Sequence, residues 1–225
     1  MEDIIDITVP LTTDIPVWPG SRGIQITPVK KIEKGDSSND SRVDFNLHTG
    51  THIDAPRHFV QNGRTIEQLS LDIFVGSCFV VDMQDAADVT PENLSALNLP
   101  CDIKRLLIRT RNSELWGEHT SEFKKDFTAF TNEAAQWIVD KGIKLIGVDY
   151  LSVQRYSDGP ETHQILLGAD IVILEGLNLS NVQAGFYELI CLPMKLVDTE
   201  AAPARVVLRR KSETYDEQSA VGGML

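Results

Sequence analysis

The segment from His48 to His58 constrains this chain more than any other, because its eleven residues place three of the five histidines around one carboxylate. In an extended backbone, side chains two residues apart share one face. All four potential ligands of this segment share that parity: His48, His52, Asp54 and His58. Imidazole and carboxylate groups are costly to bury unpaired, and they are the usual ligands of zinc, manganese and non-haem iron. The segment therefore predicts a catalytic metal site.

The residues before this segment indicate where its side chains point. Residues 43–48 alternate apolar and polar side chains, which predicts a strand with His48 on its polar side. The polar row continues into His52 and Asp54, so we expect a water-filled cleft rather than the core to receive them. The glycine and the proline of the segment could mark a simple turn, but a turn alone does not explain histidines in register.

The composition is that of a globular protein. The chain has 225 residues, of which 42% are hydrophobic and 24% are charged, so it can bury a full core as one domain. We expect that domain at residues 1–210 and a polar tail at residues 211–225. The formal net charge of −12 disfavours nucleic acid and anionic membranes, because both bind basic surfaces. We therefore expect no nucleic-acid or membrane partner.

The cysteines and the N-terminal residues indicate a compartment. Cys78, Cys101 and Cys191 are odd in number and far apart, which favours buried free thiols in a reducing environment. No Cys-x-x-Cys pair is present, so a thiolate zinc site is not supported. The first residues lack the basic and apolar regions of a signal peptide, and no apolar run reaches membrane-spanning length. We expect a cytoplasmic protein.

Apolar runs and turn residues predict an α/β (α+β) chain of strands and helices. The expected strands are residues 4–9, 24–31, 43–48, 77–81, 104–109, 144–149, 169–175, 186–196 and 204–209. The expected helices are residues 65–69, a segment that starts after Thr90, residues 131–142 and residues 160–167. Residues 33–42, 110–130 and 198–203 are expected to form loops.

Three further residues are candidates for a functional site. Trp18 lies between Pro16 and Pro19 and can form an aromatic wall for a flat substrate, although core filling is the commoner role of tryptophan. His163 falls in the first turn of an expected helix, where structure and function explain it equally well. Glu175 ends a strand, where active sites of layered α/β proteins collect, although a solvated carboxylate is commoner there.

The pattern His-x-Gly-Thr-His-x-Asp-Ala-Pro-x-His over residues 48–58 resembles the signature of the cyclase family of metal-dependent hydrolases. That family includes bacterial kynurenine formamidases and isatin hydrolases. Shorter similarities occur before and after this pattern, in the same order as in the family, at residues 6–8, 16–20, 147–152, 163–168, 175–177 and 192–196. The resemblance implies a swivelling β/β/α cyclase-type fold, in one domain with a central mixed sheet. It also implies a homodimer or a larger homo-oligomer.

The resemblance implies one or two divalent ions per subunit. His48, His52 and Asp54 match ligands of a metal, which is zinc in the formamidases and manganese in the isatin hydrolases. In formamidase-like members, Asp54 would bridge to a second ion held by the positions of His163 and Glu175. If Glu175 is not a ligand itself, we expect it to interact with His163 and to orient the His163 ring.

The resemblance also assigns a proton carrier and a substrate contact. His58 matches the catalytic acid/base, and Trp18 matches an aromatic residue that contacts the substrate. A bound metal lowers the pKa of its water and polarises a carbonyl, and a histidine with a near-neutral pKa can carry the proton to the departing nitrogen. We therefore expect a metal-dependent amidohydrolase that cleaves a non-peptide C–N bond of a small aromatic or cyclic amide. N-formylkynurenine is the expected substrate.

Two alternatives stay open at this point. Residues 198–205 lack the glycine that many relatives carry before Ala-Pro, which weakens the substrate assignment more than the metal site. The reaction could then be opening of an isatin-like lactam or cyclisation of a polyketide precursor. The second alternative is a metal-containing protein that has lost catalysis and binds a small aromatic ligand, although the intact His58 argues against it.

Overall fold

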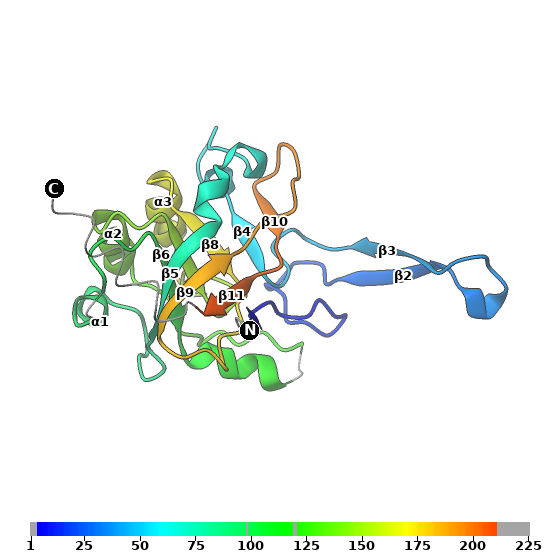
Figure 1. Ribbon diagram of the computed structural model, residues 1–225, viewed down its shortest axis with the longest axis horizontal. Helices are drawn as coiled ribbons and strands as arrows, with labels where there is room; N and C mark the ends of the chain where they lie inside the picture. The colour runs from blue at the N-terminus through cyan, green and yellow to red at the C-terminus, as the bar shows by residue number, and fades with distance from the viewer. Residues whose placement is uncertain (1–3, 98, 119–120, 211–225) are drawn as a thin grey trace.

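The computed structural model describes residues 4–210 except residues 98, 119 and 120, so the expected tail at 211–225 lies outside the described residues. Its largest element is one curled mixed sheet (Figure 1). The strands of this sheet are β1 (Ile4–Asp6), β4 (His52–Asp54), β5 (Val75–Asp82), β6 (Arg105–Arg109), β7 (Leu145–Val148), β8 (Val172–Glu175), β9 (Gly185–Ile190), β10 (Ala201–Pro203) and β11 (Val207–Arg210). Their order in the sheet is β1-β11-β9-β5-β6-β7-β8-β4-β10. The expected α+β class with a central mixed sheet is confirmed.

The other elements lie around this sheet. Two more strands, β2 (Gln25–Lys30) and β3 (Asp40–Asp44), form a separate ribbon that projects from the body (Figure 1). The α-helices are α1 (Pro91–Ser95), α2 (Asn132–Asp140) and α3 (Glu161–Gly168). The short 3-10 helices are η1 (Ile32–Lys34), η2 (Pro56–His58), η3 (Ile66–Gln68), η4 (Leu71–Ile73) and η5 (Arg111–Glu118).

The centre of the sheet is parallel from β5 to β8 and carries apolar residues on both faces. Neighbouring residues of a strand point to opposite faces, so the two sides of the sheet build two different cores. Leu106 packs beneath α2 and α3 with Ile146 and Ile173. Leu107 points the other way and packs inside the curl of the sheet with Leu174. The apolar runs predicted as buried strands are therefore covered on both faces.

The helix starts follow the capping residues that the sequence predicts. The Thr90 hydroxyl accepts a hydrogen bond from the backbone nitrogen of Asn93, and Pro91 occupies the first position of α1. The Thr131 hydroxyl likewise accepts from the backbone nitrogen of Ala134 at the start of α2. These side chains satisfy backbone N–H groups that have no partner within the helix.

The strand predicted for residues 43–48 is wrong beyond Asp44, where β3 ends. The Asn46 side chain accepts a hydrogen bond of 2.9 Å from the backbone nitrogen of His48, which closes a local turn instead of a ladder. Gly50 then adopts a positive φ of 68°, a conformation that glycine allows without steric cost. The chain therefore bends at His48 and re-enters the sheet at His52.

Other expectations also differ from the structure. The loop expected at residues 198–203 contains the edge strand β10, which pairs with β4, and the loop expected at 33–42 contains η1 and the start of β3. The long strand expected at 186–196 ends at Ile190. Cys101 is exposed rather than buried. None of the helices in the described part of the chain has the length and apolar character needed to cross a bilayer.

Candidate metal centre

Asp54 lies at the centre of the candidate site, at the end of β4. The antiparallel pairing of β4 with β8 places His52 directly opposite Glu175. His52 Nε2 is 3.3 Å from Asp54 Oδ1 and 3.4 Å from Glu175 Oε2. All three side chains are buried, with exposed fractions of 0% for His52 and Asp54 and 3% for Glu175. A His–Asp–Glu group therefore forms within the sheet itself.

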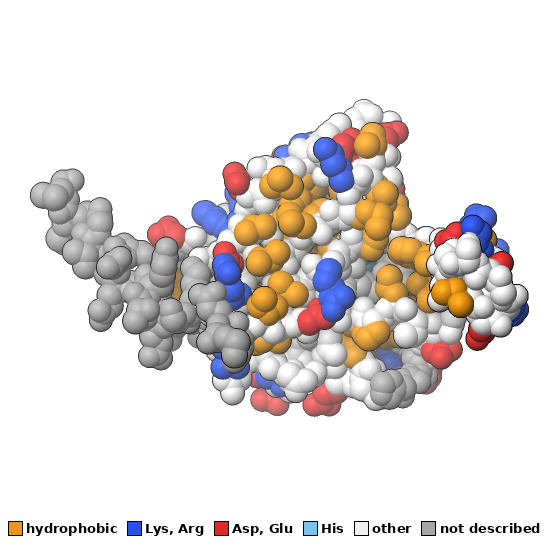
Figure 2. Space-filling view, turned by 45° about the vertical axis from the view of Figure 1, so that its right-hand side comes forward, with side chains coloured by type: hydrophobic (Ala, Val, Ile, Leu, Met, Phe, Trp, Pro, Cys, Tyr) orange, Lys and Arg blue, Asp and Glu red, His pale blue; other side chains and the backbone are white. Residues whose placement is uncertain are grey.

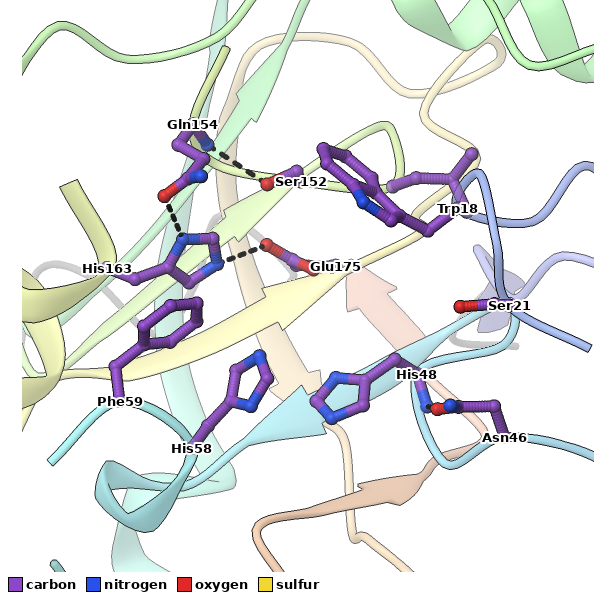
Figure 3. A pocket seen from close by; sticks show the side chains of 11 residues that line it. Trp18, Ser21, Asn46, His48, His58, Phe59, Ser152, Gln154, His163 and Glu175 are labelled. Atoms are coloured by element: carbon purple, nitrogen blue, oxygen red, sulfur yellow. Dashed lines mark hydrogen bonds and ion pairs between the residues drawn. The ribbon is translucent and has the colours of Figure 1, made fainter. Parts of the chain in front are cut away.

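His48 and His58 approach the same carboxylate from outside the strand. His48 Nδ1, on the turn before β4, is 2.9 Å from Asp54 Oδ1. His58 Nε2, at the end of η2, is 3.9 Å from Asp54 Oδ2. The two rings face one another with centroids 4.1 Å apart. Both rings also line a cavity (Figure 3).

His163 reaches the group from the first turn of α3, as the sequence predicts. Its Nε2 is 3.3 Å from Glu175 Oε1 (Figure 3) and 3.9 Å from Asp54 Oδ2. α3 packs on the sheet face to which Ile173 points, which is the face that Asp54 shares because it pairs with Ile173. The tertiary structure thus brings together in one cluster the residues expected to bind a metal and the histidine expected to carry the proton.

The grouping of these residues differs in one respect from the one that the resemblance implies. Among the described residues, two sets have ligand atoms that all lie within 4.8 Å of one another, and Asp54 belongs to both. One set is His52, Asp54 and Glu175, and the other is His48, Asp54 and His58. Asp54 therefore contributes a potential ligand atom to both sets. His58 has the geometry of a ligand as well as that of a proton carrier, and its role stays a prediction.

The cluster fits a divalent cation. Three of its buried polar atoms have no aligned hydrogen bond with any described residue: His52 Nε2, Asp54 Oδ1 and Asp54 Oδ2. The ring nitrogen of His48 is close to Oδ1, at 2.9 Å, but it is not oriented as a donor to it. Buried polar groups are almost always paired, because burial without a partner is costly. A cation bound between these atoms would satisfy all three.

The charges of the cluster reinforce this fit. Burial lowers the pKa of His52, but the adjacent carboxylates of Asp54 and Glu175 outweigh burial and raise that pKa to about 10. Burial raises the pKa of Asp54, but His48 and His52 hold it well below its usual range. A charged imidazolium thus compensates buried carboxylates in the cation-free protein. A metal ion can replace its proton, since ligands bind in their deprotonated form.

Neighbouring groups orient the rings, and sequence reasoning missed most of them. His52 Nδ1 is 2.9 Å from the Gly50 carbonyl, and His163 Nδ1 is 2.7 Å from Gln154 Oε1. An acceptor beside Nδ1 keeps the ring proton on that nitrogen, which donates the hydrogen bond, and leaves Nε2 free to face the cluster. Glu200, just before β10, has Oε1 3.5 Å from His48 Nε2. Glu200 lies in segment 198–205, which departs from the family pattern and could have drawn attention to it. No sequence pattern points to Gln154.

The cavity above the cluster has a volume of about 350 Å³. Trp18 lines it, as expected for an aromatic wall, and is held by packing on Phe123 and Tyr156 at centroid distances of 5.1 and 5.4 Å. Phe59, which the sequence analysis missed, also lines the cavity and stacks on His163 with centroids 4.5 Å apart. The cavity therefore combines the aromatic rings of Trp18 and Phe59 with His48, His58, His163 and Glu175 of the cluster (Figure 3).

The curled mixed sheet and its buried His/Asp/Glu cluster define a class, that of α+β proteins with a buried centre suited to a divalent metal. The model of the family described as putative cyclase matches residues 5–155 of this chain. The chain therefore belongs to the cyclase family, as the pattern at residues 48–58 predicts.

Individual relatives agree with this assignment. Cyclase-like protein 1 of Arabidopsis thaliana is 36% identical, over 91% of this chain and 84% of that protein. Kynurenine formamidase of Bacillus cereus is 35% identical, over 91% of this chain and 96% of the formamidase. A solved structure described as a potential metal-dependent hydrolase with cyclase activity superposes with a TM-score of 0.82 at 32% identity, over 94% of this chain and all of that one. The similarity thus spans nearly the whole described fold.

Proposed function

We propose that this chain is a metal-dependent amidohydrolase that cleaves the amide of a small aromatic compound, and that an N-formylkynurenine-like aryl formamide is its substrate. The observation that carries the proposal is the convergence of two ligand groups on Asp54 at the wall of a cavity that also contains Trp18. The kynurenine formamidase of Bacillus cereus, at 35% identity, supports the reaction. The Arabidopsis relative carries a name that specifies no substrate.

The residues that would hold the metal are those that converge on Asp54. His52 and Glu175 join Asp54 in the buried set, His48 joins it nearer to the cavity, and His163 would add a ligand beside Glu175. We propose zinc or manganese, with one or two ions per chain, because the donors are imidazole and carboxylate groups. When bound, a divalent cation supplies a Lewis acid that polarises a carbonyl and lowers the pKa of water.

His58 is the proposed proton carrier of the hydrolysis. Burial lowers the pKa of His58 below its ordinary value, with Asp54 acting in the opposite direction, so the ring is neutral near pH 7 and can accept a proton. Water adds to the formyl carbon, and His58 takes the proton that the water loses. The C–N bond then breaks, His58 returns the proton to the departing nitrogen, and an aryl amine and formic acid leave, the acid releasing its own proton to water.

Trp18 and Phe59 would bind the aromatic ring of the substrate. Both line the cavity, whose volume of about 350 Å³ lies at the small end of ligand pockets. Packing on Phe123 and Tyr156 holds Trp18 in place, so its ring position does not depend on the substrate. Such an arrangement favours flat aromatic amides over flexible aliphatic ones.

Metal analysis and a substrate panel test the proposal. Wild-type protein should contain a divalent metal, hydrolyse N-formylkynurenine and lose this activity when the metal is chelated. His52→Ala should lose both metal and activity, because it removes a buried ligand of the shared group. Full activity in metal-free protein would overturn the mechanism. Turnover of an isatin-like lactam without formamidase activity would instead assign the lactam reaction.

A second variant separates the two roles open to His58. His58→Ala should keep the metal and lose most of its turnover if His58 carries the proton, because the buried set of ligands does not include it. A loss of 100-fold or more in kcat, about the usual contribution of an acid/base, is expected. Loss of metal would make His58 a ligand instead.

A further inference from the structure

The cavity above the metal centre offers neutral hydroxyl and amide groups but no lysine or arginine. Its lining includes four such neutral groups, those of Ser21, Asn46, Ser152 and Gln154. None of its described lining residues is Lys or Arg. Hydroxyl and amide groups suit the carbonyl and N–H groups of a neutral amide. A carboxylate held among them would lose its hydration without gaining a charged partner. An acidic substituent of the substrate must therefore extend out of the cavity.

The charge of the whole protein does not attract such an anion. The formal net charge of the chain is −12. On the face of the body that Figure 2 shows, Lys and Arg side chains are scattered among acidic ones rather than gathered into a patch. Binding of an acidic substituent therefore depends on a cation close to the cavity, because the overall field of an acidic protein repels it.

Lys125 is such a cation, and a series of ring contacts connects it to the cavity. Trp18 lines the cavity, and the centroids of the Trp18 and Tyr156 rings are 5.4 Å apart. Lys125 Nζ lies 5.1 Å from the centroid of the Tyr156 ring. Tyr156 is half-buried and Lys125 is exposed, so the series leads from the cavity wall outward to the solvent. A flat substrate that packs on Trp18 can extend a substituent past Tyr156 to the ammonium group.

The structure anchors the backbone before Lys125 and leaves its ammonium group available. The hydroxyl of the buried Tyr150 accepts a hydrogen bond of 3.0 Å from the backbone nitrogen of Lys124. The Lys124 ammonium is engaged, because it forms an ion pair of 2.9 Å with Glu122. No carboxylate of the described residues forms an ion pair with Lys125, which instead lies over an aromatic ring. Its flexible four-carbon stem allows the ammonium group to meet an anion beside that ring.

We propose that Lys125 binds an acidic substituent of the substrate and so selects aryl amides that carry a carboxylate a few bonds from the ring. The proposal rests on the function proposed above, because the amide to be cleaved lies at the Asp54 cluster. N-formylkynurenine has such a carboxylate. An exposed charge pair of this kind corresponds to about 5-fold in affinity. Lys125 is remote from the reacting bond, so its contribution is to KM and not to kcat.

Steady-state kinetics with two substrates test the proposal on the metal-loaded protein, with release of the aryl amine as the readout. One substrate is N-formylkynurenine, and the other is its carboxamide, which has the same aryl formamide but no carboxylate. Lys125→Gln should raise KM for N-formylkynurenine about 5-fold and leave kcat and the kinetics of the carboxamide unchanged. In wild type, KM for N-formylkynurenine should rise with salt concentration towards that of the variant, because ions screen exposed charges.

Two further variants control for the charge and for the position of Lys125. Lys125→Arg keeps a cation and should retain a KM for N-formylkynurenine close to that of wild type. Lys141→Gln is the matched control, since Lys141 Nζ also lies 5.1 Å from the centroid of an aromatic ring, that of Trp137 in α2. Neither Lys141 nor Trp137 lines the cavity. Lys141→Gln should therefore behave like wild type with both substrates.

Four outcomes would contradict the proposal. The first is an unchanged KM of Lys125→Gln for N-formylkynurenine. The second is an equal rise of KM for both substrates, since Lys125 would then only support the Tyr156 ring and the aromatic wall. The third is a wild type that hydrolyses both substrates with the same KM, which would overturn the role of Lys125 while the proposed function stands. The fourth is a wild type that hydrolyses neither substrate, which would overturn the proposed function itself.

Discussion

His52 and Glu175 face one another across the antiparallel pair of β4 and β8, with 3.4 Å between Nε2 and Oε2. Both side chains are buried, so their separation is set by strand register rather than by mobile loops. Glu175 Oε1 also accepts a hydrogen bond of 2.8 Å from the backbone nitrogen of Val153, which holds the carboxylate in place. The cation site is therefore preorganised by the sheet.

Glu175→Gln should weaken cation binding by at least about 10-fold. The amide keeps the shape and can still accept from Val153, but it removes one negative charge from the buried group. Titration calorimetry with zinc or manganese measures the change. Glu133→Gln on the exposed side of α2 is the matched control and should bind like wild type. Equal affinities in both variants would mean that Glu175 is not part of the site.

Gly176→Ala should destabilise the protein by about 2 kcal/mol or more, since this glycine has a φ of +72°. A Cβ at this position would also lie 2.2 Å from the Gly50 carbonyl oxygen, which is the oxygen close to His52 Nδ1. Thermal unfolding and cation affinity should both decrease. Gly168→Ala, where a Cβ meets nothing within 4 Å, should leave both unchanged. An unaffected Gly176→Ala would contradict the close approach.

Gln154 should act as a positioning residue for His163. Gln154→Leu removes the acceptor at 2.7 Å from Nδ1, so the ring loses its preference for a proton on that nitrogen. We expect about 10-fold weaker cation binding. Nitrogen-15 NMR of the His163 ring in the cation-free protein should show the change of tautomer directly. Gln154→Glu keeps an acceptor and should restore the wild-type tautomer, whereas a merely structural role would not distinguish the two variants.

The stability of the cation-free protein should fall as the pH rises above neutrality. Burial lowers the pKa of His52, but Asp54 and Glu175 raise it to about 10, above its ordinary value of about 6.5. The stabilisation from this group is therefore complete below about pH 6.5 and is lost as the pH rises towards 10. Chelated wild type should lose a few kcal/mol over this range, in order of magnitude. His52→Gln should show a flatter profile in the same urea titrations.

Local sequence patterns predicted some features of the site and of the fold but not others. The ligand types and their spacing in residues 48–58 predicted a metal site, and capping residues predicted the starts of α1 and α2, because these signals act over a few residues. The extended segment expected up to His48 failed, because the Asn46 side chain bonds the backbone locally and ends the strand. The contacts of Gln154 with His163 and of Glu200 with His48 were not predicted, because each joins residues that are not neighbours in the sequence.

The sequence by itself determined the chemistry of this protein: which donors are present, that they are imidazoles and carboxylates, and the family to which the chain belongs. Only the tertiary structure decided how those donors are grouped. Strand register places Glu175 with His52, and the turn at Gly50 brings His48 back towards His58. The physical reason is that coordination depends on distances of a few ångströms between residues remote in sequence, and only the packed sheet sets those distances.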